Sequence, residues 1–358
     1  EAPVSHVSNK KYFKANEQQF QATPEQEKLP SLVHQPETKM LSRKVILSVE
    51  IFCNSRMANN TGGVTVNSQI FLTPNPKFDS IMALYYIIDD IVGCEDDGTE
   101  ISKKTYGLIC VKTDQDNDSD VYLLPSSIPT RTQYQVVKNE KELLTNFADI
   151  VCSSDPDFII GYEVQKQSIG YIIDRGSEIY GLNLLRLLSR MPHERESYLN
   201  TEGVDKYGDD HTSSIHITGR IVLNVWRNMK AELKLYTYSV HNVASQLLAK
   251  RIPCFTYGQL TKWYTHSKYR HRVYYYIYLL AEVNGLLLDK LDIIRRTGES
   301  ARLYGIDFYS VLSRGSQYRV EAVLLRKAHA NGYICLAPSK AKVARQAAMS
   351  VIPLVCIS

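Results

Sequence analysis

A short, almost uninterrupted apolar run at positions 45–52 places the strongest constraint on how this chain can fold. Its length suits a β-strand, and the Asn-Asn-Thr-Gly-Gly sequence at 59–63 provides a turn after it. Further strand-like segments occur at 81–88 and 106–111, with an acidic turn at 95–98 between them. These segments predict that the folded part of the chain begins with a β-sheet.

Helical spacing first appears after these strands. Between 138 and 153, Leu143, Phe147 and Val151 fall on one helix face, and Asp155-Pro156 ends the pattern. Further predicted elements are strands at 158–160 and 221–226, helices at 168–180, 239–250, 270–296 and 309–330, and a polar loop at 192–214. Strands that alternate with helices predict a mixed α/β sheet covered by helices.

Composition excludes some classes of protein. The seven cysteines contain no Cys-x-x-Cys pair, which argues against zinc and fits reduced thiols in a cytosolic or nuclear protein. The longest apolar run, 273–288, is broken by Glu282 and Asn284, so we expect a buried helix and no membrane span.

Residues 1–40 are polar and are expected to form an extended lead-in. The net charge of +4 is compatible with nucleic acid without demonstrating it.

Four segments carry long and specific sequence patterns. They are 74–88, the run Asp155-Pro156-Asp157-x-Ile159-Ile160-Gly161-Tyr162-Glu163-Val164-Gln165, residues 219–235, and the run Ala301-Arg302-Leu303-Tyr304-Gly305-Ile306-Asp307-Phe308-Tyr309 with its continuation to Glu321. Together they resemble family B DNA polymerases, most closely the translesion, or zeta, branch of that family, over roughly residues 41–358.

This resemblance implies a domain organisation. It predicts an RNase H-like (DnaQ-type) exonuclease-like α/β domain at 41–296, after the lead-in at 1–40, and a helical connector at 297–358 that leads towards a polymerase palm. The palm motifs themselves are missing from this sequence. The resemblance also implies primer–template DNA, accessory polymerase subunits and a sliding clamp as partners, a nuclear location, and Mg²⁺ as the cofactor of the parent polymerase, with no cofactor in this stretch.

The same resemblance places the acids of a proofreading site at three positions that are filled here by Ser48, Ser168 and Leu280. Glu50 retains the second acid of an Asp-x-Glu motif, and Tyr276 begins the Tyr-x-x-x-Asp motif. Two divalent cations roughly 4 Å apart need several carboxylates to offset their repulsion. A serine hydroxyl is a poor neutral substitute, and leucine cannot bind a hard cation.

We therefore predict an inactive 3′–5′ exonuclease fold with no catalytic residue and no metal site. Glu50 is then a hydrogen-bonded strand residue, and Tyr276 packs in the core. Without proofreading, a mismatched or lesion-distorted 3′ end would be extended and not removed, which suits the bypass of damaged templates.

Candidate DNA contacts lie towards the end of the chain. Arg314, Gln317 and Arg319 fall in the most recognisable segment, and Lys340 and Lys342 belong to a basic, acid-free tail. Such residues neutralise phosphates without reading sequence. Alternatively, the arginines make internal links and the tail is a solvated face. A second basic cluster at 262–272 is either an exposed helix start or a phosphate contact.

Two other functions remain open from the residues alone. An active exonuclease could recruit rearranged ligands from Glu50, Glu163, Asp174 and Glu282. Alternatively, the chain is a protein-interaction module that binds partners through the loop at 192–214 or the lead-in at 1–40.

Overall fold

The computed structural model describes residues 43–57, 71–93, 100–112, 128–191, 213 and 215–333. The lead-in, the turns expected at 59–63 and 95–98, and nearly all of the loop at 192–214 lie outside these ranges. Residues 42–358 form one compact unit.

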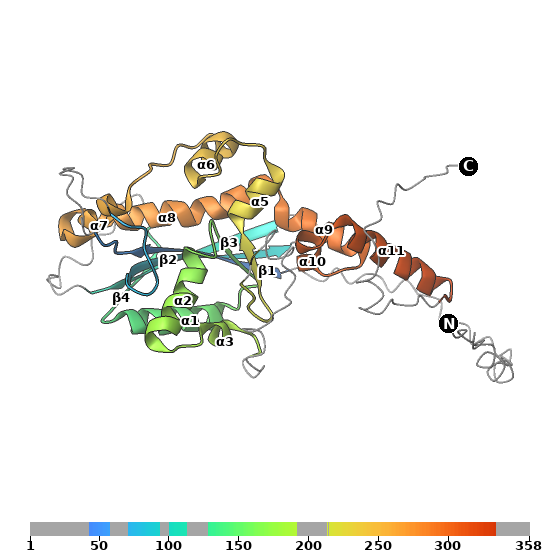
Figure 1. Cartoon of the computed structure of the whole chain (residues 1–358), viewed down its shortest axis with the longest axis horizontal. Helices are drawn as coiled ribbons and strands as arrows, with labels where there is room; N and C mark the ends of the chain where they lie inside the picture. Colours follow the sequence, from blue (N-terminus) through green and yellow to red (C-terminus); the bar gives the residue numbers. More distant parts are fainter. Residues whose placement is uncertain are drawn as a thin grey trace, which may run out of the picture. The chain divides into compact units, whose positions relative to one another are not determined.

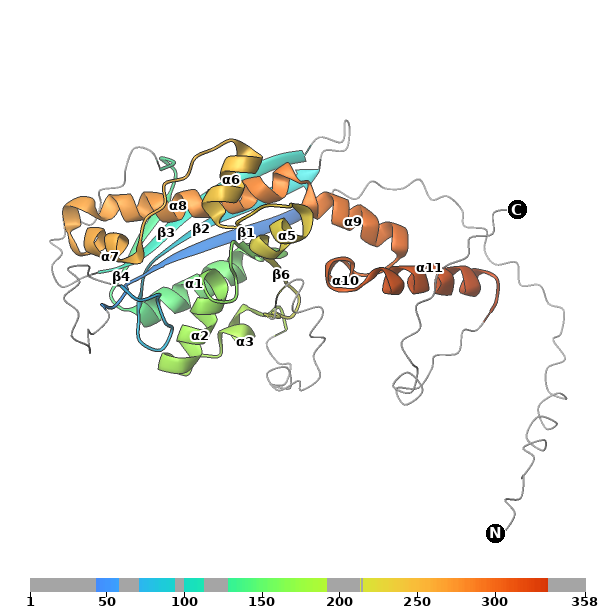
Figure 2. The same ribbon diagram turned by 45° about the horizontal axis from the view of Figure 1, so that its top comes forward.

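A six-stranded sheet, in the order β4-β3-β2-β1-β5-β6, lies at the centre of this unit with helices on both faces (Figures 1 and 2). The strands are β1 (Arg43–Cys53), β2 (Ile81–Gly93), β3 (Glu100–Val111), β4 (Gln133–Val137), β5 (Phe158–Gly161) and β6 (Ile221–Asn224). The pairs β1–β2 and β2–β3 are antiparallel, whereas β3–β4, β1–β5 and β5–β6 are parallel. The predicted mixed α/β sheet covered by helices is confirmed.

Strand β1 is apolar along most of its length because it is covered on both faces. Leu47 and Val49 are fully buried on one face, and Ile46 is buried on the other. Strands covered on both sides read as continuous apolar runs, and strands with one solvated side alternate. Ser48 and Glu50 are polar exceptions on the same face as Ile46, and both are buried as well.

Three helices cover one face of the sheet and a longer helical layer covers the other (Figure 1). On the first face lie α1 (Glu140–Ser154), α2 (Ser168–Tyr180) and α3 (Leu184–Leu188). On the second, α8 (Ser267–Lys290) runs along β1 and β2, with α5 (Val225–Glu232), α6 (Val240–Leu248) and α7 (Tyr257–Thr265) packed against it. The chain continues through α9 (Ile293–Tyr304), α10 (Phe308–Ser313) and α11 (Ser316–Ala330).

Two long predicted helices are each divided in the structure. The helix expected at 270–296 ends at Lys290, and α9 begins only after Asp292, whose left-handed φ of 49° breaks the helical path. The helix expected at 309–330 is interrupted at Arg314-Gly315, where the backbone is extended between α10 and α11. The expected domain boundary between residues 296 and 297 falls inside α9.

Other differences are local. The strand expected at 221–226 ends at Asn224, whose side chain accepts a hydrogen bond from the Arg227 amide and begins α5. Strand β4 and helix α7 were not predicted. Within the described ranges, no helix has both the length and the apolar character to cross a membrane.

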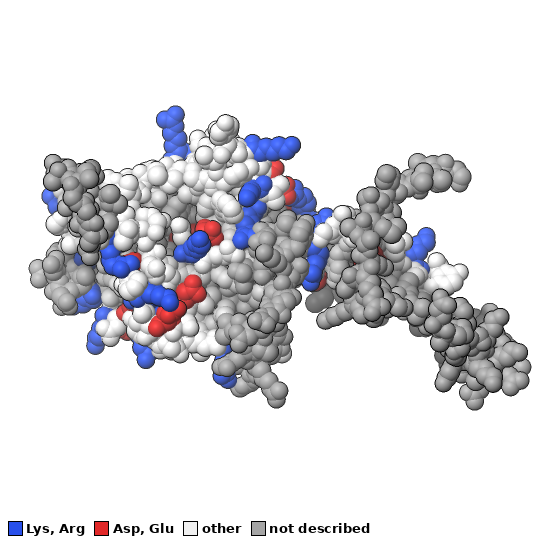
Figure 3. Space-filling view, in the orientation of Figure 1, with Lys and Arg blue, Asp and Glu red and all other residues white. Residues whose placement is uncertain are grey.

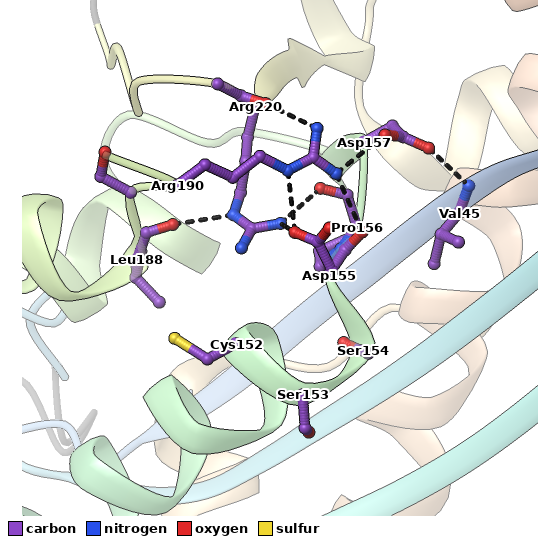
Figure 4. Close-up of polar contacts among 12 residues, drawn as sticks. Val45, Cys152, Ser153, Ser154, Asp155, Pro156, Asp157, Leu188, Arg190 and Arg220 are labelled. Carbon is purple, nitrogen blue, oxygen red and sulfur yellow. Dashed lines mark hydrogen bonds and ion pairs between the residues drawn. The ribbon is translucent and has the colours of Figure 1, made fainter. Parts of the chain in front are cut away.

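A polar network fixes the start of β5 beside β1 (Figure 4). Arg190 and Arg220 both donate to Asp155 Oδ1 at 2.8 Å, and Arg190 also pairs with Asp157 at 2.8 Å. The hydrogen bond from Arg190, helped by Arg220, holds the pKa of the Asp155 carboxyl below its usual range. Asp157 Oδ2 in turn accepts from the Val45 amide at 3.0 Å, at the first residues of β1. This anchor sets the β1–β5 register and so positions the segment after β5.

Candidate functional site

Two of the positions expected for nuclease acids, Ser48 and Ser168, lie at the second half of β1 beside the retained Glu50. Ser48 is 3% exposed, and its Oγ donates to the carbonyl oxygen of Ala281 on α8 at 2.7 Å. A hydroxyl committed to a backbone carbonyl fills the space between strand and helix. It supplies no charge for a cation.

Glu50 is the one acid retained from the expected pattern. Its side chain is buried at 6% exposure, and its Oε1 accepts from Asn284 Nδ2 at 2.6 Å and from the Tyr162 amide at 3.2 Å. Burial raises the pKa of Glu50 to about 7, although both hydrogen bonds act in the opposite direction. At neutral pH this carboxyl is therefore divided between its protonated and charged forms, which weakens it as a metal ligand.

Ser168 lies at the start of α2 in a left-handed backbone conformation, with a φ of 43°. It is fully buried, and its Oγ donates to the Val49 carbonyl oxygen at 2.6 Å. A Cβ on Gly161 would lie 2.4 Å from this oxygen, so the glycine is needed to let the serine reach β1. The structure thus brings Ser168 beside β1, but its hydroxyl is used within the backbone framework.

Tyr276 and Leu280 lie one turn apart on α8. The Tyr276 ring packs edge-to-face on Phe255, with centroids 5.2 Å apart, and stacks near His241 at 6.5 Å. Burial raises the pKa of Tyr276. Leu280 is half-buried and packs against the main apolar core. Tyr276 and Leu280 therefore both take part in side-chain packing.

The acids of the alternative, rearranged site lie in different surroundings. Glu163 accepts from the Gln165 amide at 3.2 Å, and Glu282 pairs with Lys250 at 3.1 Å, while Asp174 is exposed on α2. Across the described ranges, no three His, Cys, Asp or Glu side chains are grouped to hold a metal ion. The donors present near β1 do not fit the metal pair of a proofreading nuclease, because Ser48, Leu280 and Ser168 bring no charge to Glu50.

A small cleft of about 30 Å³ opens between the strands β1, β2 and β3 and the helix α8, beside Ser48. Its volume admits little more than a water molecule. Two of its acids are already paired, Asp89 with Lys104 at 3.6 Å and Glu282 with Lys250 at 3.1 Å. The cleft therefore offers no space for a nucleotide.

The three described candidates for DNA contact lie around the start of α11. Arg314 is exposed and stands over the Tyr318 ring at 5.9 Å. Gln317 donates to Glu321 at 2.8 Å, and Arg319 donates to the Val311 carbonyl oxygen at 2.6 Å. Arg319 thus ties α11 to α10, and Arg314 is exposed. Lys340 and Lys342 lie outside the described residues.

Sequence reasoning missed Asn284, which supplies the shortest contact to Glu50. It is fully buried, and its Oδ1 finds no hydrogen-bond partner among the residues that the structure describes. The available signal was its position as an amide within an otherwise apolar stretch of helix, where a buried polar group needs a partner. Nothing in the sequence indicated that this partner would be Glu50.

The sequence model of the exonuclease domain of DNA polymerase family B matches residues 6–243 of this chain. The chain belongs to the DNA polymerase family B exonuclease domain. The expected RNase H-like sheet is therefore confirmed by both family and topology.

Among relatives, this family B chain is similar to DNA polymerase zeta catalytic subunits. It is 32% identical to that of Arabidopsis thaliana over 87% of this chain and 16% of the relative. It is 36% identical to those of Mus musculus and Homo sapiens, in each case over 79% of this chain and 9% of the relative. The chain thus corresponds to the exonuclease-domain region of a zeta-like polymerase and spans only a small part of these relatives' length.

Proposed function

We propose that this region is an exonuclease-like domain that does not cut DNA, and that it supports a polymerase and contacts primer–template DNA. The observation that carries the proposal is the enclosure of Glu50. Its buried carboxyl accepts at Oε1 from Asn284 and the Tyr162 amide, and the neighbouring Ser48 hydroxyl donates to a backbone carbonyl. Phosphodiester cleavage by two metal ions needs anionic ligands on both ions, and these groups do not provide them.

Translesion synthesis follows as the setting in which such a domain is useful. A polymerase without proofreading extends a mismatched or damaged primer end and leaves it in place. The parent protein is then a DNA-directed DNA polymerase of the zeta type, which uses Mg²⁺ in a palm outside this sequence. We place it in the nucleus with accessory subunits and a sliding clamp. The similarity to zeta catalytic subunits supports this assignment.

Contact with duplex phosphates is assigned to the basic groups near the end of the chain. Arg314 is exposed at the start of α11, and Lys340 and Lys342 follow in the sequence. Cations of this kind bind the backbone of primer–template DNA in a salt-dependent way and do not select a sequence.

The test is release of nucleotides from a labelled single strand by residues 1–358, with Mg²⁺ and then Mn²⁺. We expect no metal-dependent release, while a proofreading-competent family B exonuclease domain digests the same strand in parallel. Cleavage that needs metal and disappears in Glu50→Gln would overturn the proposal. So would a manganese-soaked crystal with two anomalous peaks beside Glu50. Failure to shift a primer–template at low salt would refute the DNA-contact part.

A further inference from the structure

A long acid-free segment forms the helical layer on one face of the sheet. Between Glu232 and Glu282 the sequence contains no aspartate or glutamate. The same segment carries the basic residues Lys234, Lys250, Arg251, Lys262, Lys268, Arg270 and Arg272. Figure 3 shows Lys and Arg side chains at the end of the molecule where α7 lies. The chain is nearly balanced overall, so this imbalance is local.

Three of these cations, Lys262, Lys268 and Arg272, surround the junction of α7 and α8, which we call the basic elbow. All three are exposed, and within the described ranges none of them lies within ion-pair distance of a carboxylate. Arg270 differs from them, because it is buried and donates to the Tyr264 carbonyl oxygen at 3.1 Å, where it closes the end of α7. Arg270 therefore serves the fold, whereas the elbow cations make no comparable link.

The electrostatics of α8 do not favour a positive charge at Lys268. It stands in the first turn of α8, where the positive end of the helix dipole disfavours cations, and that turn contains no acid. Its charge therefore costs stability in the isolated domain. An anion bound at the elbow would offset that cost.

Aromatic rings are interleaved with the elbow cations. The guanidinium of Arg272 stands 5.3 Å from the Trp263 ring and 5.1 Å from the Tyr269 ring, and Lys262 lies 5.8 Å above Phe71. Tyr269 remains 38% exposed. Cations that neutralise phosphates beside rings on which bases stack are typical of surfaces that bind single-stranded nucleic acid.

The far end of α7 from the elbow contacts the segment that leads to Ser168. Tyr257, at the start of α7, is 37% exposed, and its hydroxyl accepts from Gln167 Nε2 at 3.3 Å. A strand that ran from the elbow along α7 to Tyr257 would reach the loop between β5 and α2. We propose that the basic elbow binds a segment of single-stranded DNA, with Lys262, Lys268 and Arg272 on its phosphates and the exposed tyrosine rings beneath its bases. This inference rests on the proposed DNA contact of the domain but not on the loss of nuclease activity.

The test measures binding of a labelled oligothymidylate to the full chain by fluorescence anisotropy across a salt series. The variant Lys262→Glu/Lys268→Glu/Arg272→Glu should bind at least about tenfold more weakly. The slope of log K against log salt should fall by about 0.7 for each phosphate that the variant no longer neutralises. The matched control is Arg131→Glu/Lys138→Glu/Lys141→Glu, which reverses three exposed cations near β4 and α1. It should stay within about twofold of the parent. Unchanged thermal melting confirms that both variants fold.

A second variant tests the stacking component. Tyr269→Ala should weaken binding of the oligothymidylate and leave binding of an abasic strand of equal length unchanged.

Equal binding by the elbow variant and the parent, or an equally large decrease in the control, would overturn the inference. An elbow variant that no longer bound anionic vesicles and kept the oligothymidylate would overturn it in favour of a membrane surface. If the parent binds a primer–template duplex but the elbow variant shows no defect on single strands, only this inference fails. If the parent binds no DNA, the proposed function fails with it.

Discussion

Asn284 donates its side-chain Nδ2 to Glu50 Oε1 at 2.6 Å, from a position on α8 that is fully buried. The only other donor to this carboxyl among the described residues is the Tyr162 amide, at 3.2 Å. Both donors are neutral. The carboxyl is therefore held in place but its charge is poorly compensated, and burial dominates its pKa.

Replacing Glu50 with glutamine should stabilise the domain at high pH. The folded-state pKa of Glu50 is raised from 4.5 to about 7, so the folded state binds more protons in that window and stability falls as pH rises through it. Glu50→Gln removes this pH-dependent destabilisation. We expect a gain of up to about 3 kcal/mol at pH 8 and little at pH 5, measured by urea unfolding. The control Glu178→Gln alters an exposed pair with Lys77 and should change neither value. An equal effect at both pH values would contradict the prediction.

In a polymerase that carries this domain, as we propose, Glu50→Ala should leave the mutation rate unchanged. The reason is that no proofreading activity depends on this carboxyl if the domain does not cut. Glu50→Gln is the companion variant, because it keeps an acceptor for the Asn284 and Tyr162 donors. Mutation frequency in cells and misincorporation during primer extension are the two measurements. A mutator phenotype in both variants, at normal protein levels, would argue for a working nuclease.

The buried pair Glu140–Arg175 should be a strong determinant of stability. Both side chains are less than 10% exposed, at a separation of 3.0 Å, and Glu140 also accepts from the Ile81 amide at 2.7 Å. Arg175→Leu leaves the carboxylate buried without its cation, so we expect a destabilisation of about 3–5 kcal/mol. Lys77→Ala breaks an exposed pair and should cost less than about 1 kcal/mol. Chemical unfolding of both variants checks the difference, and similar costs would refute it.

Gly107 on β3 is required by the ring of Tyr86 across the strand pair. A Cβ at Gly107 would lie 2.0 Å from that ring. Gly107→Ala should therefore destabilise the sheet by about 1–3 kcal/mol, and less in a Tyr86→Ala background. Gly285→Ala on α8 is the control, since no neighbouring atom lies within 4 Å of its added Cβ. It should be neutral or stabilising by about 0.5–1 kcal/mol. Thermal melts of the four variants measure these effects. If the costs of Gly107→Ala and Tyr86→Ala simply add in the double variant, the prediction is wrong.

The sequence alone predicts the parts of the fold that local patterns dictate. The apolar run of β1 and the apolar face of α1 are buried in the structure, and the spacing of apolar residues in the sequence indicates such burial directly. Strand β4 was missed because it is five residues long and mostly uncovered at the sheet edge. Helix α7 carried a usable signal in its N-cap, since Thr256 accepts from the Gln259 amide at 3.3 Å. The break at Asp292 had none, because left-handed geometry at an aspartate leaves no apolar pattern.

The candidate site, like the fold, could be predicted from the sequence only in part. Alternation along β1 places Ser48 and Glu50 on one face, and this follows from strand geometry. Their partners, Ala281 and Asn284, come from a helix more than two hundred residues later. Only the tertiary packing of α8 against β1 decides which of its groups meet the strand. For that reason the missing acids could be predicted from the sequence, whereas what replaced them could not.

The commitment of the Ser48 and Ser168 hydroxyls to backbone carbonyls has an evolutionary consequence. A change to aspartate at either position would turn a donor into an anion facing a carbonyl oxygen in a closed interior. A single substitution that restored one acid would therefore destabilise the domain, and it would bring no gain in activity until the other metal ligands were also restored. The two hydrogen bonds therefore make it costly to restore either acid alone, and we expect relatives that share this packing to keep a neutral side chain at both positions.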